Sequence, residues 1–277
     1  MFKRILTGVI AFCFVLVPIL FFADTLVLPI AVAVFSLIAT YELLHCVGLH
    51  KNLWVSIPLY LVSAALPFGV RMMTVVTVFA LPLSLCVILL YLLAAAVFSH
   101  GKADIQDVST AFMLWLYTLL GFFGLIMVHD HIRGGEYLYL LAFLGAWVTD
   151  IFAYFTGMLL GRHKLIPDVS PKKTVEGSVG GIVFCMIAMV IFGLVCDILY
   201  PQYNINLWVF ALGGLIASVV AQIGDLLMSV IKRTYGIKDY GKLFPGHGGI
   251  LDRFDSVLAV SIVMAAFCSF FRFFEVI

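Results

Sequence analysis

Long apolar stretches follow one another through almost the whole chain, and they leave few alternatives to a membrane protein. Hydrophobic residues make up 64% of the 277 residues and charged residues only 11%, whereas soluble domains are about a quarter charged. A soluble core cannot bury so much apolar surface, so lipid must surround most of it. We therefore expect an all-α polytopic membrane protein.

These stretches predict about nine transmembrane helices, because a span needs about 20 mostly apolar residues. The first stretch has a basic start and a longer apolar run than a cleaved signal peptide, so it is interpreted as a helix that remains. Three prolines, Pro29, Pro58 and Pro67, interrupt the second and third spans. The predicted spans are residues 5–23, 25–47, 53–69, 72–98, 108–128, 137–160, 179–200, 207–231 and 254–275.

Basic residues follow the positive-inside rule. They precede the first span and recur in the loops after the sixth and eighth spans, which lie in the cytoplasm if the N-terminus does. The opposite loops hold only Arg71 and Arg133 as basic residues. No soluble domain fits between spans, so we expect one membrane domain over 1–277, with N-terminal helices in 1–100 and the site in 101–277.

Two functional classes lack support. The net charge is +1, with no basic excess or aromatic-basic interleaving, so no nucleic-acid partner is expected. The six cysteines are scattered through apolar segments without a CxxC or Cys/His cluster, so neither a zinc site nor a disulfide framework is expected. They are interpreted as small apolar fillers.

Nearly half of the charged residues lie in two segments, 161–177 and 225–256. Two predicted spans separate them, so the segments return to the same face and can meet. Basic loops beside membrane helices often only set topology or contact anionic lipid, which explains Arg162, Lys164 and Lys242. A role in topology or lipid contact does not explain why acids and glycines lie among the basic residues. We therefore predict that the two segments form one polar site at the membrane surface.

Asp225 lies within the eighth span, where an ionised carboxylate costs about 2.5–3.5 kcal/mol. At about 100° per residue it shares a helix face with Gln222, Ser229 and Lys232. This polar stripe runs into the charged loop, which favours a site over the alternative, a buried polar contact between helices.

Three more acids are candidates. Asp150, in the sixth span, shares a face with Tyr154, Gly157 and Gly161, and simple helix packing explains the glycines equally well. Asp252 and Asp255 stand three residues apart before the ninth span, and either could instead cap that helix.

Carboxylates, amines and glycines together indicate a hard cation and phosphates. Mg²⁺ prefers oxygen ligands, and two such ions can assist a displacement at phosphorus. Lys and Arg neutralise phosphate charge, and glycines let backbone N–H groups approach an anion. The PGHGG sequence has this composition but is not a Walker A motif.

The other charged segment reads SPKKTVEGSVGG. Pro171 predicts a turn, and Lys172 and Lys173 are predicted phosphate contacts. Thr174, Glu176 and Ser178 stand where the seventh span begins, and a helix N-terminus is a natural anion site. Ser178 is equally well explained as the N-cap.

Residues 229–255, SVIKRTYGIKDYGKLFPGHGGILDRFD, resemble the signature of the phosphatidate cytidylyltransferases, also called CDP-diacylglycerol synthases. The upstream SPKKTVEG and QIGDLLMS sequences resemble the family too, so the likeness covers the C-terminal half. The matching signature residues are Ser229, Lys232, Arg233, Lys238, Asp239, Gly241, Pro245, His247, Gly248, Gly249, Asp252, Arg253 and Asp255.

The resemblance implies that phosphatidate attacks the α-phosphorus of CTP, giving CDP-diacylglycerol and pyrophosphate with Mg²⁺, which is paired with K⁺ in the family. It implies a homodimer in the plasma (inner) membrane of a bacterium, in contact with membrane lipid and with the site facing the cytoplasm.

The resemblance also implies roles for individual residues. Asp225 and Asp252 are the implied metal ligands, with Asp150 and Asp255 as further candidates. The implied catalytic set is Asp225, Asp252, Lys232, Arg233, Ser229 and His247. The implied substrate contacts are Lys172, Lys173, Thr174, Glu176, Lys238, Asp239, Gly248, Gly249 and Arg253.

Two alternatives stay open at this point. A CTP-dependent polyprenol or lipid kinase shares the chemistry but directs attack to the γ-phosphorus. A secondary transporter predicts charges spread through the bundle and symmetry between the halves. Neither feature is apparent in the sequence. The N-terminal half has few buried ionisable residues, and no repeat symmetry relates the two halves.

Overall fold

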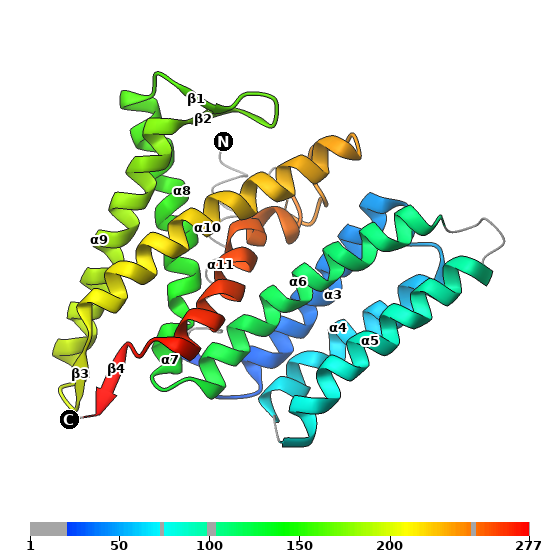
Figure 1. The fold of residues 1–277 in the computed structure, drawn as a ribbon, viewed down its shortest axis with the longest axis horizontal. Helices are drawn as coiled ribbons and strands as arrows, with labels where there is room; N and C mark the ends of the chain where they lie inside the picture. Colours follow the sequence, from blue (N-terminus) through cyan, green and yellow to red (C-terminus); the bar gives the residue numbers. More distant parts are fainter. Residues whose placement is uncertain (1–20, 73–74, 99–103, 245–247, 277) are drawn as a thin grey trace. The chain divides into compact units, whose positions relative to one another are not determined.

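A computed structural model describes residues 21–72, 75–98, 104–244 and 248–276 (Figure 1). Within these ranges, eight helical segments are long and apolar enough to cross a membrane, and the chain is an integral membrane protein. The first predicted span, 5–23, lies almost entirely outside the described residues. The helices are α3 (Val27–Val47), α4 (Leu53–Arg71), α5 (Val75–Phe98), α6 (Ile105–His131), α7 (Gly135–Leu138), α8 (Leu140–Leu160), α9 (Val175–Leu199), α10 (Leu207–Thr234) and α11 (Leu251–Phe270).

The remaining eight predicted spans correspond to these helices, and the all-α fold class is confirmed. Pro58 and Pro67 lie inside α4 and do not end it. Pro29 stands in the first turn of α3, where a missing N–H leaves no helical bond unmade. The main shifts are at α9, which begins four residues earlier than predicted, and α11, which ends at Phe270 rather than continuing to 275.

The chain divides into two compact units. Unit 1 comprises residues 1–126 and 235–253, and unit 2 comprises residues 127–234 and 254–277. The expectation of a single domain over 1–277 stays a prediction.

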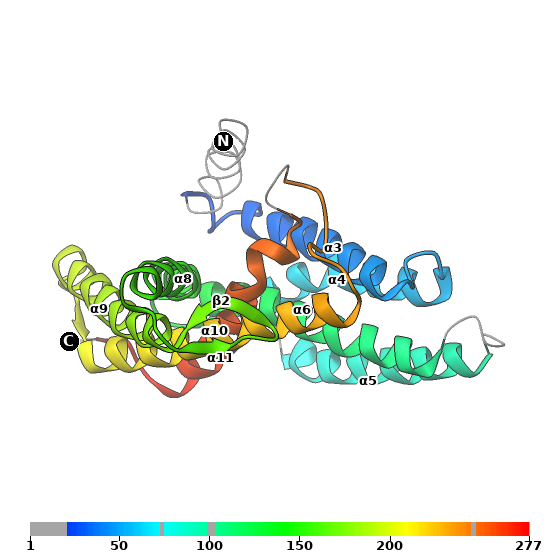
Figure 2. The same cartoon turned by 90° about the horizontal axis from the view of Figure 1, so that it is seen from above.

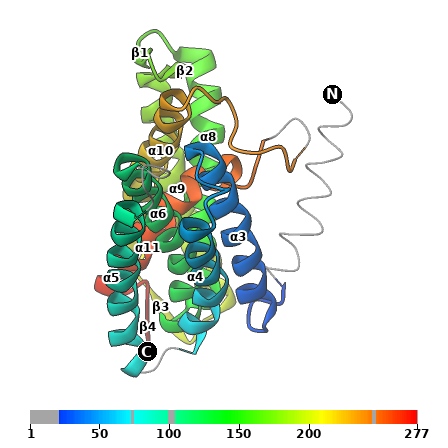
Figure 3. The same cartoon turned by 90° about the vertical axis from the view of Figure 1, so that its right-hand side faces the viewer.

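In unit 1, α3 packs against α4, and α4 packs against α5 (Figure 3). Polar side chains join α3 to α4, and α4 to α6, within the apolar core. The hydroxyl oxygens of Thr40 and Ser63 lie 2.8 Å apart, and the indole N–H of Trp115 donates to the Ser63 hydroxyl at 2.9 Å. Each polar group is therefore paired although it is buried.

In unit 2, α8, α9 and α10 lie side by side, as two views show (Figures 1 and 2). Glycines bring the helix backbones close together. A Cβ atom at Gly214 of α10 would lie 2.8 Å from the Cα atom of Met186 in α9, and one at Gly177 of α9 would lie 2.6 Å from the carbonyl oxygen of Ala153 in α8. Small residues commonly permit such approach between membrane helices.

Two short antiparallel sheets of two strands each add to the helices of unit 2. Strands β1 (Lys164–Ile166) and β2 (Ser170–Thr174) form a hairpin between α8 and α9, while β3 (Tyr203–Ile205) pairs with β4 (Phe274–Val276). The prediction that Pro171 sets a turn was wrong, because the chain turns at residues 167–169 and Pro171 lies within β2. A two-stranded ribbon has only edge strands, which tolerate proline.

Candidate active site

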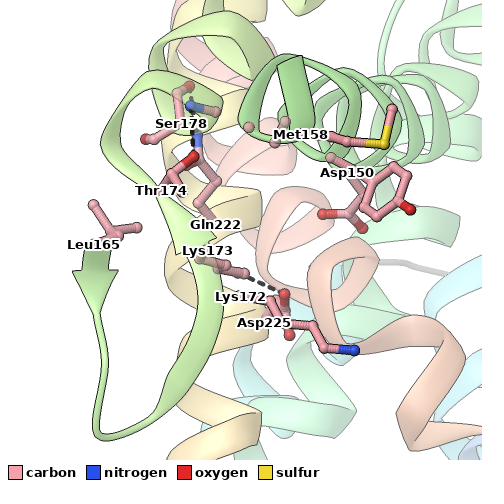
Figure 4. Close-up of a pocket in the computed structure, with 13 residues that line it drawn as sticks. Asp150, Met158, Leu165, Lys172, Lys173, Thr174, Ser178, Gln222 and Asp225 are labelled. Carbon is pink, nitrogen blue, oxygen red and sulfur yellow. Dashed lines mark hydrogen bonds and ion pairs between the residues drawn. The ribbon is translucent and has the colours of Figure 1, made fainter. Parts of the chain in front are cut away.

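A pocket of about 300 Å³ opens in unit 2 between α8, the β1–β2 hairpin, the start of α9 and α10 (Figure 4). Its lining contains several of the predicted polar residues. They are Asp150, Tyr154, Gly157, Lys172, Lys173, Thr174, Ser178, Gln222 and Asp225. The pocket thus collects residues that the sequence analysis had found in separate segments.

An ion pair joins the two charged segments at this pocket. The Nζ atom of Lys173, on β2, lies 2.6 Å from Oδ2 of Asp225, on α10, and each side chain is about a quarter exposed. The prediction that segments 161–177 and 225–256 meet is confirmed for this pair. Lys172, the other predicted phosphate contact, also lines the pocket and is exposed.

The polar stripe of α10 has two parts. The hydroxyl of Ser229 lies 3.4 Å from Oδ1 of Asp225, on the same helix face. The buried amide of Gln222 instead donates to the backbone carbonyl oxygens of Ser178, at 3.4 Å, and Ser218, at 3.3 Å. Gln222 therefore ties α10 to α9, whereas Asp225 pairs with Lys173 at the pocket lining.

Two more carboxylates gather in unit 2. Oδ2 of Asp150 lies 3.3 Å from the hydroxyl of Ser256, which also lies 3.4 Å from Oδ1 of Asp255. Asp255 interacts electrostatically with three charged groups of the same unit, those of Asp225, Lys232 and Asp150. Asp255 is the fifth residue of α11 and so does not cap that helix.

The start of α9 holds the hairpin in place. Thr174 is the N-cap, because its hydroxyl oxygen accepts the N–H of Gly177 at 3.1 Å. The alternative that assigned this role to Ser178 was wrong, since α9 starts before it. The Glu176 carboxylate accepts the backbone N–H groups of Arg162, at 3.1 Å, and His163, at 3.2 Å. These bonds tie the residues just before β1 to the start of α9, and β1 in turn pairs with β2, the strand that carries Lys173. The substrate roles of Thr174 and Glu176 stay predictions.

Asp252 lies in unit 1 and is nearly buried, at 8% exposure. Its Oδ2 atom accepts the N–H groups of Tyr240, at 2.8 Å, and Gly249, at 3.0 Å. Gly248 has a φ of 84°, and a Cβ atom there would lie 2.6 Å from the same oxygen, so only glycine fits. The bonds of Asp252 organise the signature segment, and its role as a metal ligand together with Asp225 stays a prediction.

Other signature residues are placed as follows. Lys238, Asp239 and Arg253 are exposed in unit 1, and Lys232 and Arg233 stand in the last turn of α10 in unit 2. His247 lies outside the described residues, and its role stays a prediction.

Glu42 of α3 was not among the predicted site residues. This residue is only 4% exposed, and its carboxylate accepts two backbone N–H groups from the signature segment. A charged residue within an apolar span was the signal, the same signal that identified Asp225.

The donor set of unit 2 suits a hard cation. Its polar side chains at the pocket offer carboxylate and hydroxyl oxygens, which Mg²⁺ prefers. Among the described residues, no three His, Cys, Asp or Glu side chains form a ready-made cage for a metal. Mg²⁺ needs no such cage, because it usually binds one or two carboxylates together with water and substrate phosphates.

Apolar spanning helices with a pocket of amines and carboxylates define an integral membrane protein suited to a phosphorylated ligand. A model of the cytidylyltransferase family matches residues 2–271. The chain belongs to the cytidylyltransferase family, which favours an enzyme over the transporter alternative.

Curated relatives carry the name phosphatidate cytidylyltransferase. That of Staphylococcus aureus (strain COL) is 36% identical over 264 residues, which cover 93% of this chain and 95% of the relative. That of Staphylococcus haemolyticus is 38% identical over 169 residues, and that of Staphylococcus saprophyticus is 40% identical over 169 residues. For these two, the alignment spans 61% of this chain and 62% of the relative.

Proposed function

We propose that the protein is a phosphatidate cytidylyltransferase, which converts CTP and phosphatidate into CDP-diacylglycerol and pyrophosphate for phospholipid synthesis. Membership of the family supports this proposal, as does the relative from Staphylococcus aureus that aligns over 95% of its length. The single structural observation that carries it is the pairing of Lys173 with Asp225 in the pocket lining.

The reaction needs alignment and charge more than a strong base. A phosphate oxygen of phosphatidate, already ionised at neutral pH, forms a bond to the α-phosphorus of CTP. The bond from that phosphorus to the oxygen bridging to the β-phosphorus breaks, and pyrophosphate leaves with the electron pair. Catalysis then comes from holding the two phosphates in line and stabilising the developing negative charge.

The basic residues supply this stabilisation. Lys172 and Lys173 bind substrate phosphates from the hairpin, and Lys232 and Arg233 bind them from the end of α10. Asp225 orients the Lys173 amine, since the two groups are already paired. Lys238, Asp239, Gly248, Gly249 and Arg253 are assigned to the substrate on the strength of the family signature, and His247 and Ser229 to the catalytic set.

Asp225 and Asp252 are the proposed ligands of Mg²⁺, with Asp150 and Asp255 as supporting acids and K⁺ as a second ion. When bound, the metal neutralises phosphate charge and makes the α-phosphorus more electrophilic. The carboxylate and hydroxyl oxygens near Asp225 support this choice of metal.

The substrates come from two phases. CTP is dissolved in the cytoplasm, and phosphatidate lies in the bilayer, which suits a polar pocket at the end of spanning helices. We assign the protein to the bacterial inner membrane with the site facing the cytoplasm, because the basic loops follow the positive-inside rule. The homodimer rests on the family resemblance.

The test uses purified protein in detergent with labelled CTP, phosphatidate and Mg²⁺. Wild-type protein should release pyrophosphate and form CDP-diacylglycerol. Asp225→Asn should lower kcat by about 100-fold or more, the usual effect of removing a charge from a site that stabilises a transition state.

Asp197→Asn provides the matched control, because Asp197 is an exposed acid near the opposite end of α9 and lies outside the pocket. It should keep wild-type turnover. Release of CDP instead of pyrophosphate would identify a CTP-dependent lipid kinase and overturn the proposal.

A further inference from the structure

Glu42 is a buried acid in α3, within the sequence IATYELLHCV of residues 38–47. Only 4% of its surface is exposed. A carboxylate in such surroundings is costly, and acids in spanning helices are normally paired and functional.

Its partners are backbone N–H groups at the start of α11. Oε1 of Glu42 accepts the N–H of Ile250 at 3.0 Å, and Oε2 accepts the N–H of Leu251 at 2.9 Å. α11 begins at Leu251, and the preceding residue, Ile250, has no polar side chain to serve as a cap. The first N–H groups of a helix need acceptors, and a negative charge there also interacts favourably with the helix dipole. Glu42 thus caps the first residues of α11, which belong to the same unit as α3 although they are far from Glu42 in the sequence.

Two signature glycines make room for this carboxylate. A Cβ atom at Gly249 would lie 2.1 Å from Oε1 of Glu42, and one at Gly241 would lie 2.2 Å from the same atom. Either contact is too short for a real side chain. The glycines of the signature therefore serve at least in part to admit Glu42, and not only to approach a phosphate.

A second carboxylate, that of Asp252, binds the same segment. Oδ2 of Asp252 accepts the N–H of Gly249, directly before the two N–H groups that Glu42 accepts. Three consecutive backbone N–H groups, those of residues 249–251, are therefore bound by two carboxylates. Displacing Glu42 frees two of these groups next to Asp252.

We propose that Glu42 is a positioning residue for the cytidylyl transfer: it fixes residues 248–253, the α11 entry segment, so that Asp252 and Arg253 are held in place for the substrate. This inference rests on the proposed function. It assigns the N-terminal helices a role in the site, through α3, which the signature itself does not contain.

The experiment compares Glu42→Gln with wild-type full-length protein in lipid nanodiscs. Gln has nearly the same volume, but its NH₂ group faces a backbone N–H where an acceptor is required. Hydrogen exchange of peptides covering residues 248–253 should accelerate, while exchange in the rest of α3 stays unchanged. In the same preparation, kcat per folded protein should fall by about tenfold or more, as expected when a charged acceptor is lost.

Gly241→Ala is the second variant, because its Cβ atom would displace Oε1 of Glu42 without altering the acid. It should reproduce both effects. Thr40→Val is the matched control: Thr40 is also buried in α3, but its hydroxyl contacts Ser63 in α4. It should leave exchange of the α11 entry segment at the wild-type rate.

Wild-type exchange and wild-type kcat in Glu42→Gln would overturn the positioning role. Faster exchange with unchanged kcat would also overturn it, leaving Glu42 a structural cap only. If instead the wild-type protein itself forms no CDP-diacylglycerol, the proposed function fails, and the exchange data still report on the Glu42 contacts independently.

Discussion

The Nζ atom of Lys173 lies 2.6 Å from Oδ2 of Asp225, so that an amine on a β-hairpin and a carboxylate within a spanning helix form an ion pair at the pocket. Neither group is fully exposed, and each stands in a segment that concentrates charge in an otherwise apolar chain. The pair explains how an acid is tolerated in α10, and it places the proposed phosphate-binding amine beside a candidate metal ligand.

The first prediction concerns the coupling of this pair. Lys173→Met and Asp225→Asn should each lower kcat/KM strongly, because each leaves an unpaired charge in the pocket. The double variant should lose less than the product of the two single losses, with a coupling energy of about 0.5–3 kcal/mol. Steady-state kinetics of the four proteins measures it.

The matched control for that cycle is Lys164→Met. Lys164 is an exposed lysine on β1, the neighbouring strand of the same hairpin, and it does not line the pocket. Any loss of kcat/KM from Lys164→Met should simply multiply with the loss from Asp225→Asn in the double variant. If the losses of kcat/KM from Lys173→Met and Asp225→Asn also simply multiplied in the double variant, a functional ion pair would be contradicted.

The second prediction concerns helix packing in unit 2. Gly214→Ala should lower the free energy of unfolding by about 1–3 kcal/mol, the usual effect of overpacking, because its Cβ atom would lie 2.8 Å from the backbone of Met186. Gly69→Ala in α4 is the control, since nothing lies within 4 Å of a Cβ atom there. Thermal unfolding in detergent should show a loss for the first variant and none for the second. If Gly214→Ala unfolded at the same temperature as Gly69→Ala, the close approach of α9 and α10 would be refuted.

The third prediction concerns the cap of α9. Thr174→Ala should destabilise the protein by about 1 kcal/mol, because the N–H of Gly177 loses its acceptor. Thr174→Ser keeps the hydroxyl and should recover most of that stability in the same unfolding measurement. If serine were no better than alanine, the methyl group of Thr174, rather than its hydrogen bond, would be the relevant feature.

The fourth prediction concerns the metal. A chelator should abolish formation of CDP-diacylglycerol, and added Mg²⁺ should restore it, because the acids around Asp225 offer only oxygen donors. Zn²⁺ should restore little activity, since it prefers nitrogen and sulfur ligands. Assays with chelator plus excess Mg²⁺ control for inhibition by the chelator itself. Full turnover in the presence of chelator alone would eliminate the metal assignment.

Much of the candidate site was predictable from local signals. Asp225 was identified because a charge inside an apolar span demands a reason, and Asp150 for the same reason. Glu42 carried this signal too, but its importance depends on N–H groups at residues 250 and 251, more than 200 positions away. The cap of α9 was uncertain because Thr174 and Ser178 are both suitable residue types, and only the helix start distinguishes them.

By itself, the sequence determined that the chain crosses a membrane many times, because transfer of apolar side chains to lipid depends on composition within each stretch of about 20 residues. Its signature spacing also determined the family that the chain resembles. Only the tertiary structure decided that Lys173 meets Asp225 and that Glu42 caps α11. Such contacts join segments far apart in the chain, and they depend on how helices pack, which no local pattern encodes.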